Sequence, residues 1–299
     1  VPYLVTILPF ELKDNFMIVS YISFLLINLI IYYWFRGMGF SVLQSFCTCL
    51  LYIFSFVGIY NFHNFVHIGL FEQLLFLIAF ISIQKNKFLP LFLVVLFGSF
   101  AKETFILLIP LYFIVNFDKT AKKSIIFKTS TLLVVYFLIF FLIRETNLFF
   151  SNNARFSFYT KFLAHNFFYD RIWNKPFNII VVVIVAFTFW IPFAITGFLF
   201  SDKKTRLLSL LIVFTSSLLI LGSDIERAVA ISFPAFLLLF GSFLKRIKKG
   251  EIVLLTCFNI LVFLAYDHTW TNASLYVGIT WLLGIVFNIC LRKKQIPDR

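Results

Sequence analysis

The chain has 299 residues, of which 61% are hydrophobic and 13% charged, and its 26 Lys and Arg outnumber its 13 Asp and Glu to give a formal net charge of +13. A mean hydropathy of +0.97 excludes a water-soluble globular domain, because too few polar residues are present to cover one. The apolar runs lack the alternating pattern of barrel strands. The sequence therefore predicts an all-α, polytopic transmembrane helix bundle.

In chain order, the apolar runs predict about eleven spans in a single integral membrane domain that covers residues 1–299. The predicted spans are Met17–Phe35, Val42–Tyr60, Ile68–Ile83, Phe88–Phe100, Thr104–Phe117, Ile125–Ile143, Phe177–Phe200, Leu207–Gly222, Ala228–Leu244, Ile252–Tyr266 and Ala273–Leu291. With a cytoplasmic C-terminus, most basic residues fall inside and most acidic residues outside, which is the positive-inside pattern. We therefore expect the N-terminal segment outside, and we expect the positive charge to reflect topology rather than nucleic-acid binding.

The one long outer loop, residues 144–176, mixes basic residues with Phe, Tyr and Trp. Such a composition suits a segment that lies on the membrane interface, so we expect an amphipathic, partly helical lid. The four cysteines all fall inside predicted spans and indicate no disulfide framework and no metal site.

A Lys102-Glu103 pair is the only charged interruption between Phe88 and Phe117. The run is either one interrupted helix or two short helices that meet at the pair. A charge at mid-bilayer costs roughly 2.5–3.5 kcal/mol on insertion scales, so such residues usually face a polar cavity. In the functional interpretation Lys102 binds a phosphate and Glu103 orients it or transfers a proton. In the structural alternative, the two charges neutralise each other at a helix junction.

A second polar cluster holds Asp224, Glu226 and Arg227 between two predicted spans. Asp224 and Arg227 are three residues apart, so on a helix they share a face and can bracket a pyrophosphate, with Arg227 in bidentate contact. The alternative is that Asp224 caps the following helix.

His63 and His67 have a spacing that can chelate a metal on a helix, but no Cys pair or His-Glu-x-x-His accompanies them. We therefore predict no metal and no cofactor. Glu72 lies about one turn into its span and is expected to face the same outer cavity as the other polar clusters, with His67 beside it.

Three short segments resemble bacterial multi-span proteins related to the GT-C-type membrane glycosyltransferases. They are Val1–Phe10, Gly98–Pro110 with its Lys-Glu-Thr and closing Pro, and the set of Asp224, Arg227 and Pro234. The resemblance implies a polyprenyl-phosphate-sugar donor and a catalytic base in a first outer loop. That loop is expected upstream of Val1, which would make the chain an N-terminal truncation, with Glu11 and Asp14 as the fallback candidates for the base.

The sequence hypothesis is therefore a glycosyltransferase at the outer face of a bacterial cytoplasmic membrane, with a lipid-linked sugar donor, a glycan or lipid acceptor and membrane lipids as partners. Lys102 and Arg227 are expected to hold phosphate, and Glu103 and Asp224 to organise the acceptor or the leaving group. Glu72, His67 and Glu226 are further substrate-binding candidates. The alternatives are a surface-polysaccharide polymerase or ligase that uses the long outer loop, and a transporter or non-enzymatic membrane protein.

Overall fold

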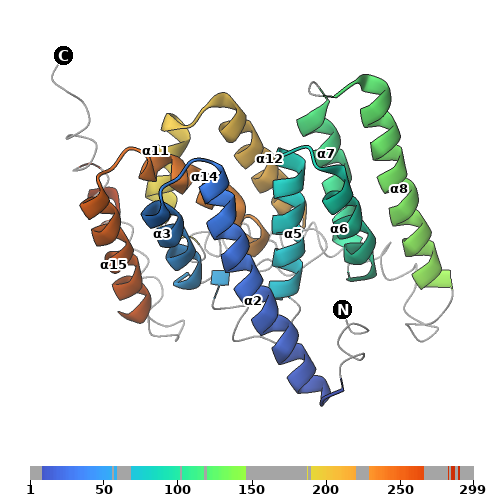
Figure 1. Cartoon of the computed structure of the whole chain (residues 1–299), viewed down its shortest axis with the longest axis horizontal. Helices are drawn as coiled ribbons and strands as arrows, with labels where there is room; N and C mark the ends of the chain where they lie inside the picture. The colour runs from blue at the N-terminus through green and yellow to red at the C-terminus, as the bar shows by residue number, and fades with distance from the viewer. Residues whose placement is uncertain are drawn as a thin grey trace, which may run out of the picture.

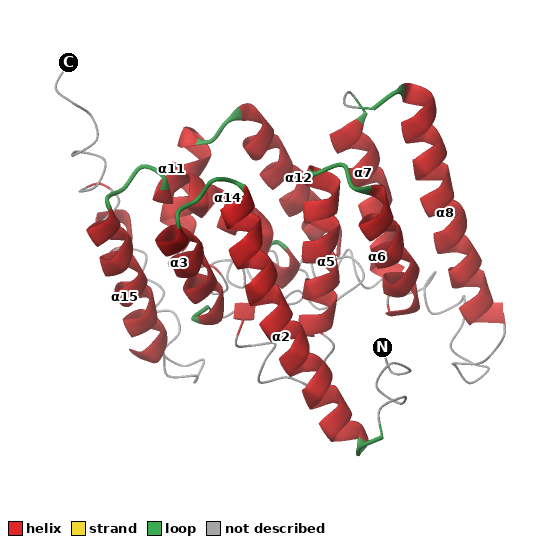
Figure 2. Cartoon of the chain, viewed as in Figure 1, coloured by secondary structure: helices red, strands yellow, loops and turns green. Residues whose placement is uncertain are grey.

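A computed structural model describes residues 9–55, 57–58, 69–101, 103–117, 120–145, 187, 190–219, 229–265, 282, 284–286 and 289. All regular elements within these residues are helices (Figure 2). They are α2 (Leu12–Gly37), α3 (Val42–Ile53), α5 (Gly69–Gln84), α6 (Phe88–Ala101), the 3₁₀ helix η1 (Glu103–Leu107), α7 (Leu108–Asn116), α8 (Lys122–Glu145), α11 (Trp190–Phe200), α12 (Lys203–Leu219), α14 (Phe233–Leu244) and α15 (Lys249–Ala265). The predicted all-α class is confirmed.

Every predicted span from Met17–Phe35 to Ile252–Tyr266 overlaps at least one of these helices, whereas most of Ala273–Leu291 lies outside the described residues. Among the described helices, α2 and the Lys122–Leu142 part of α8 are long and apolar enough to cross a membrane. The remaining apolar helices are shorter; α3, for example, has 12 residues. At 1.5 Å per residue such a helix falls short of a hydrocarbon core about 30 Å thick, so the number of spans stays a prediction.

The first helix begins at Leu12, earlier than the predicted Met17, because polar residues form its first turn. Asp14 places a carboxylate near the positive end of the helix dipole. Asn15 donates from Nδ2 to the carbonyl of Phe10 at 3.0 Å. The next helix, α3, starts at a capping box, in which Ser41 and Gln44 each accept a hydrogen bond from the other's backbone N–H. These local charges and hydrogen bonds determine where α2 and α3 begin.

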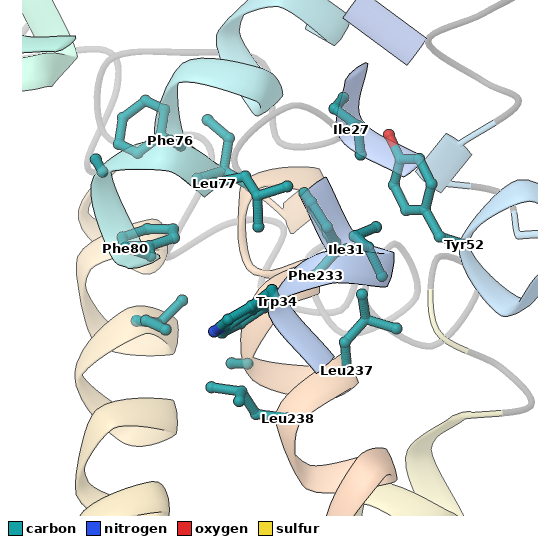
Figure 3. Packing of buried hydrophobic residues seen from close by; sticks show 14 of the residues in the cluster. Ile27, Ile31, Trp34, Tyr52, Phe76, Leu77, Phe80, Phe233, Leu237 and Leu238 are labelled. Carbon is teal, nitrogen blue, oxygen red and sulfur yellow. The ribbon is translucent and has the colours of Figure 1, made fainter. Parts of the chain in front are cut away.

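One face of helix α2 packs into the core, whereas its other face is exposed. Its residues Ile27, Ile31 and Trp34 recur at helical spacing and form one buried stripe. Figure 3 shows this stripe between side chains of α5 on one side and side chains of α14 on the other, with Tyr52 of α3 alongside. The labelled neighbours are Phe76, Leu77, Phe80, Phe233, Leu237 and Leu238.

Helices α11 and α14 approach each other most closely at Gly197. A Cβ added there would overlap the backbone carbonyl of Leu239. Phe193 of α11 also packs on Phe240 and Phe243 of α14, with ring centroids 5.8 and 5.1 Å away. A glycine at the crossing lets two backbones meet without the side-chain gap that a larger residue needs.

The surface of the bundle is apolar along its helices, whereas many polar side chains are inside. Exposed Leu, Ile, Val and Phe residues follow α2, α8, α12 and α15, for example Leu25, Phe127, Leu138, Phe214 and Leu261. Asn, Gln, Ser and Thr side chains are among the buried residues. Exposed apolar side chains along several helices are typical of a surface that contacts lipid or another protein.

Five loops lie together at one end of the bundle, the upper end in Figure 1, namely α2–α3, α5–α6, α7–α8, α11–α12 and α14–α15. Side chains connect them: Lys245 Nζ donates to Met38 O at 3.3 Å, and Asn86 Nδ2 donates to Thr120 Oγ1 at 3.0 Å. We call this the basic end. Its described Lys and Arg residues are Arg36, Lys85, Lys87, Lys122, Lys123, Lys128, Lys203, Lys204, Arg206, Lys245, Arg246, Lys248 and Lys249.

Candidate functional site at the opposite end

The chain reverses direction between α6 and η1, at the predicted Lys102-Glu103 pair. Helix α6 runs away from the basic end and α7 runs back toward it (Figure 1). A Cβ on Gly98 would overlap the ring of Phe105, so the glycine allows the two arms to pack closely. Phe105 in turn stacks on Phe76 of α5, with ring centroids 4.6 Å apart. Of the two predicted arrangements, the structure has two short helices that meet at the pair.

Glu72 lies beside this reversal. It is in the first turn of α5 and is only 5% exposed. Thr104, the second residue of η1, donates its hydroxyl to Glu72 Oε1 at 3.3 Å. The carboxylate lies in the first turn of α5, near the positive end of the helix dipole. The contact places Glu72 against the start of η1.

Gln73 and Tyr52 form a second buried polar pair next to Glu72. Tyr52 donates its hydroxyl to Gln73 Oε1 at 2.7 Å. Gln73 is 1% exposed and Tyr52 is fully buried. The amide nitrogen Nε2 of Gln73 has no hydrogen-bond partner within the described part of the chain. A buried donor without a partner costs about 1–3 kcal/mol, so this amide is a ready donor for an acceptor atom of a ligand.

Helix α14 begins next to the Tyr52–Gln73 pair. Its first residue, Phe233, packs its ring 4.8 Å from the ring of Tyr52. Ser232 precedes it and donates its hydroxyl to Val229 O at 2.6 Å. The predicted Asp224–Arg227 cluster comes just before this described segment. The start of α14 is therefore anchored on the Tyr52–Gln73 pair.

Side chains that hydrogen-bond to the backbone hold the end of α3. Ser55 donates to Tyr52 O at 2.7 Å and accepts from Gly58 N at 3.1 Å. Asn259 of α15 donates from Nδ2 to Phe54 O at 3.1 Å. These bonds fix Tyr52 at the last turn of α3. The starts of α5, η1 and α14 thus meet the end of α3 at one end of the bundle, which we call the polar end.

The predicted site residues divide into three groups. Glu72 and Glu103 both fall at the polar end, Glu103 as the first residue of η1. Glu11 and Asp14 are exposed at the start of α2, which extends beyond the start of α5 (Figure 1). The remaining candidates lie outside the described residues, and so does nearly all of the predicted lid at residues 144–176. They are His67, Lys102, Asp224, Glu226 and Arg227.

The sequence did not single out Tyr52 or Gln73, and Thr104 entered only as part of the Lys-Glu-Thr motif. Gln73 carried a signal, because it makes two adjacent polar residues with Glu72 inside an apolar run. Tyr52 carried none, since it is one of 12 tyrosines and its partner is on another helix. Chemically, the polar end combines a carboxylate acceptor, a free amide donor and two hydroxyls, a set suited to the hydroxyl groups of a neutral ligand. Among the described residues, no group of three or more His, Cys, Asp or Glu could hold a metal ion.

Comparison with known proteins adds no relative: no protein-family model, curated protein or solved structure matches this chain. The fold alone therefore defines the class. Within the described residues the protein is an all-helical bundle with an apolar exterior, and two of its helices are long and apolar enough to cross a membrane.

Proposed function

We propose that the protein is a polytopic membrane glycosyltransferase of about eleven spans, whose basic end faces the cytoplasm and whose polar end faces outward. The apolar exterior supports membrane embedding, because exposed Leu and Phe side chains on several helices are stable against lipid and costly against water. The gathering of basic loops at one end supports the orientation.

The proposed reaction moves a sugar from a polyprenyl-phosphate donor to a lipid-linked or cell-surface glycan acceptor. The acceptor hydroxyl attacks the anomeric carbon and its proton passes to a carboxylate, while the bond to the phosphate oxygen breaks and polyprenyl phosphate leaves. Lys102 and Arg227 stabilise the phosphate charge, and Glu103 and Asp224 organise the acceptor or the leaving group.

One observation carries the proposal. The Thr104–Glu72 bond joins η1 to α5, and the Tyr52–Gln73 bond joins α5 to α3 beneath the start of α14. Buried polar groups are expensive in a lipid-embedded bundle, and their concentration at one place is typical of a substrate site. In the sequence, Lys102 directly precedes η1, and Arg227 comes six residues before Phe233, the first residue of α14.

Sugar transfer in membranes that express the chain from its complete reading frame tests the proposal. Glu72→Gln is expected to lower transfer by at least about tenfold, since loss of a charge-assisted hydrogen bond costs about 1.5–3 kcal/mol. Glu251→Gln at the basic end is the matched control and is expected to retain transfer. Undiminished sugar transfer by the Glu72→Gln variant would show that Glu72 is not part of the substrate site.

The phosphate-binding roles have their own test in the same assay. Arg227→Lys is expected to be nearly as harmful as Arg227→Ala, because a guanidinium engages two phosphate oxygens and an ammonium supplies a point charge. Lys102→Arg is expected to be milder than Lys102→Ala, because Lys102 acts through charge alone. Normal use of the lipid-phosphate donor by both alanine variants would exclude the proposed roles.

A further inference from the structure

Three cations, one from the last turn of α2 and two from other loops, converge on the short connection between α2 and α3. Arg36 ends α2 and donates from a terminal guanidinium nitrogen to Phe40 O at 2.6 Å. Lys245, from the α14–α15 loop, places its ammonium 3.3 Å from Met38 O and 4.2 Å from the centre of the Phe40 ring. Lys85, from the α5–α6 loop, has its Nζ 3.8 Å from the position that a Cβ on Gly37 would occupy.

Within the described part of the chain, no acidic side chain balances the positive charge of this cluster. All three side chains are exposed, and among the described residues Arg36 and Lys245 donate to backbone carbonyls rather than to carboxylates. The acidic residues described at this end are used elsewhere: Asp202 accepts from Thr205 N at 2.9 Å, and Glu251 accepts from Lys248 N at 2.8 Å. Three like charges around one loop repel each other, and a bound anion relieves that repulsion.

The surface beside the cluster is open and apolar. A Cβ added to Gly39 would meet nothing within 4 Å, so no side chain covers the loop there. Along α2, Leu25, Leu29 and Tyr33 are exposed by 64%, 53% and 68%. They are spaced four residues apart, so they follow one another on one face of the helix, and Arg36 lies at the end of that face.

We propose that Arg36, Lys85 and Lys245 bind the phosphate of an anionic phospholipid, with an acyl chain of the lipid along Leu25, Leu29 and Tyr33. A free phosphate would satisfy the charges but leave the apolar stripe without a role. A zwitterionic lipid would cover the stripe but carry a compensating positive charge to the cations. An anionic phospholipid matches both features. The proposal rests on the proposed membrane embedding and needs no glycosyltransferase activity.

The test measures binding of phosphatidylglycerol and of phosphatidylcholine to the full chain purified in detergent, by native mass spectrometry. The variant is Lys85→Gln with Lys245→Gln, which leaves Arg36 in its bond to Phe40 O. The control is Lys122→Gln with Lys123→Gln, which removes the same charge from the α7–α8 region of the same end. Each Lys near an anionic lipid adds to the attraction, so the variant is expected to lose about tenfold or more in phosphatidylglycerol affinity.

The expected pattern is that wild type prefers phosphatidylglycerol, the control keeps that preference, and the variant loses it. Lys85→Arg with Lys245→Arg is expected to restore binding, which separates loss of charge from damage to the loop. Equal losses in variant and control, equal binding of both lipids by wild type, or full displacement of the lipid by inorganic phosphate would each overturn the proposal. Loss of sugar transfer would not bear on it.

Discussion

The two ends of the bundle handle polar residues in opposite ways. At the basic end, most of the described Lys and Arg side chains are exposed. Several of the basic side chains there are held by backbone carbonyls or aromatic rings; the half-buried Arg206, for example, donates to Ser201 O and Leu199 O. At the polar end, Glu72 and Gln73 are buried and each is bonded to another helix. Exposed charge orients a protein and attracts headgroups at small cost, whereas buried polarity is costly and must be organised. We therefore expect equivalent substitutions to lower the free energy of unfolding more at the polar end than at the basic end.

The largest contrast is expected between two glycines. Gly98→Ala places a Cβ against the Phe105 ring and is expected to destabilise the protein by about 3 kcal/mol, because the reversal between α6 and η1 must open. Gly250→Ala in α15 meets nothing within 4 Å and is expected to be neutral or stabilising by up to about 1 kcal/mol. Thermal unfolding in detergent compares them. Equal stabilities of the two variants would contradict the tight packing of the reversal.

A smaller contrast is expected between two tyrosines. Tyr52→Phe leaves both Oε1 and Nε2 of the buried Gln73 amide without a partner among the described residues. It is expected to lower the free energy of unfolding by about 2 kcal/mol. Tyr112→Phe at the basic end removes a longer bond, 3.3 Å, to Asn86, which keeps its bond to Thr120. Its expected cost is below about 1 kcal/mol.

The double variant Tyr52→Phe with Gln73→Leu sharpens this comparison. Replacing both partners with apolar groups is expected to recover most of the stability that Tyr52→Phe loses, because no unpaired polar atom remains. Additive losses in the double variant would show that the two side chains are not coupled.

The smallest effect is expected at Asp202, which precedes α12 at the basic end. Hydrogen bonds from the Thr205 side chain and backbone lower the pKa of its carboxyl. Because the folded-state pKa is below the unfolded one, this stabilisation is complete above the ordinary Asp pKa and is lost as the pH falls through the lowered value. Asp202→Ala is expected to cost about 1 kcal/mol at neutral pH.

Unfolding measured across pH tests this cap. The difference between wild type and Asp202→Ala is expected to shrink in acid, whereas Asp202→Asn is expected to retain the cap at every pH. A difference that does not change with pH would exclude the carboxylate as the cause.

The sequence predicted those features that depend on local chemistry. Charge within an apolar run predicted a helix break at Lys102-Glu103, and α6 ends at Ala101 while η1 begins at Glu103. The cost of a carboxylate within a span predicted that Glu72 avoids lipid and faces an outer cavity; Glu72 is buried, and the cavity stays a prediction. The Tyr52–Gln73 pair could not be predicted, because it depends on how α3 and α5 are placed against each other rather than on spacing within either helix. The predicted span Met17–Phe35 left out the first turn of α2, because apolar runs define spans and this turn holds Lys13 and Asp14, although an acidic first turn favours a helix.

The central claim of this account is that the two ends lie on opposite sides of a membrane. Single-cysteine labelling in intact bacteria tests it directly, with Asp14→Cys and Lys248→Cys placed one at a time in a chain whose four native cysteines are replaced by serine or alanine. Both positions are exposed in the structure. We predict that a membrane-impermeant maleimide labels Asp14→Cys in intact cells and labels Lys248→Cys only after permeabilisation. Labelling of Lys248→Cys in intact cells would contradict the claim.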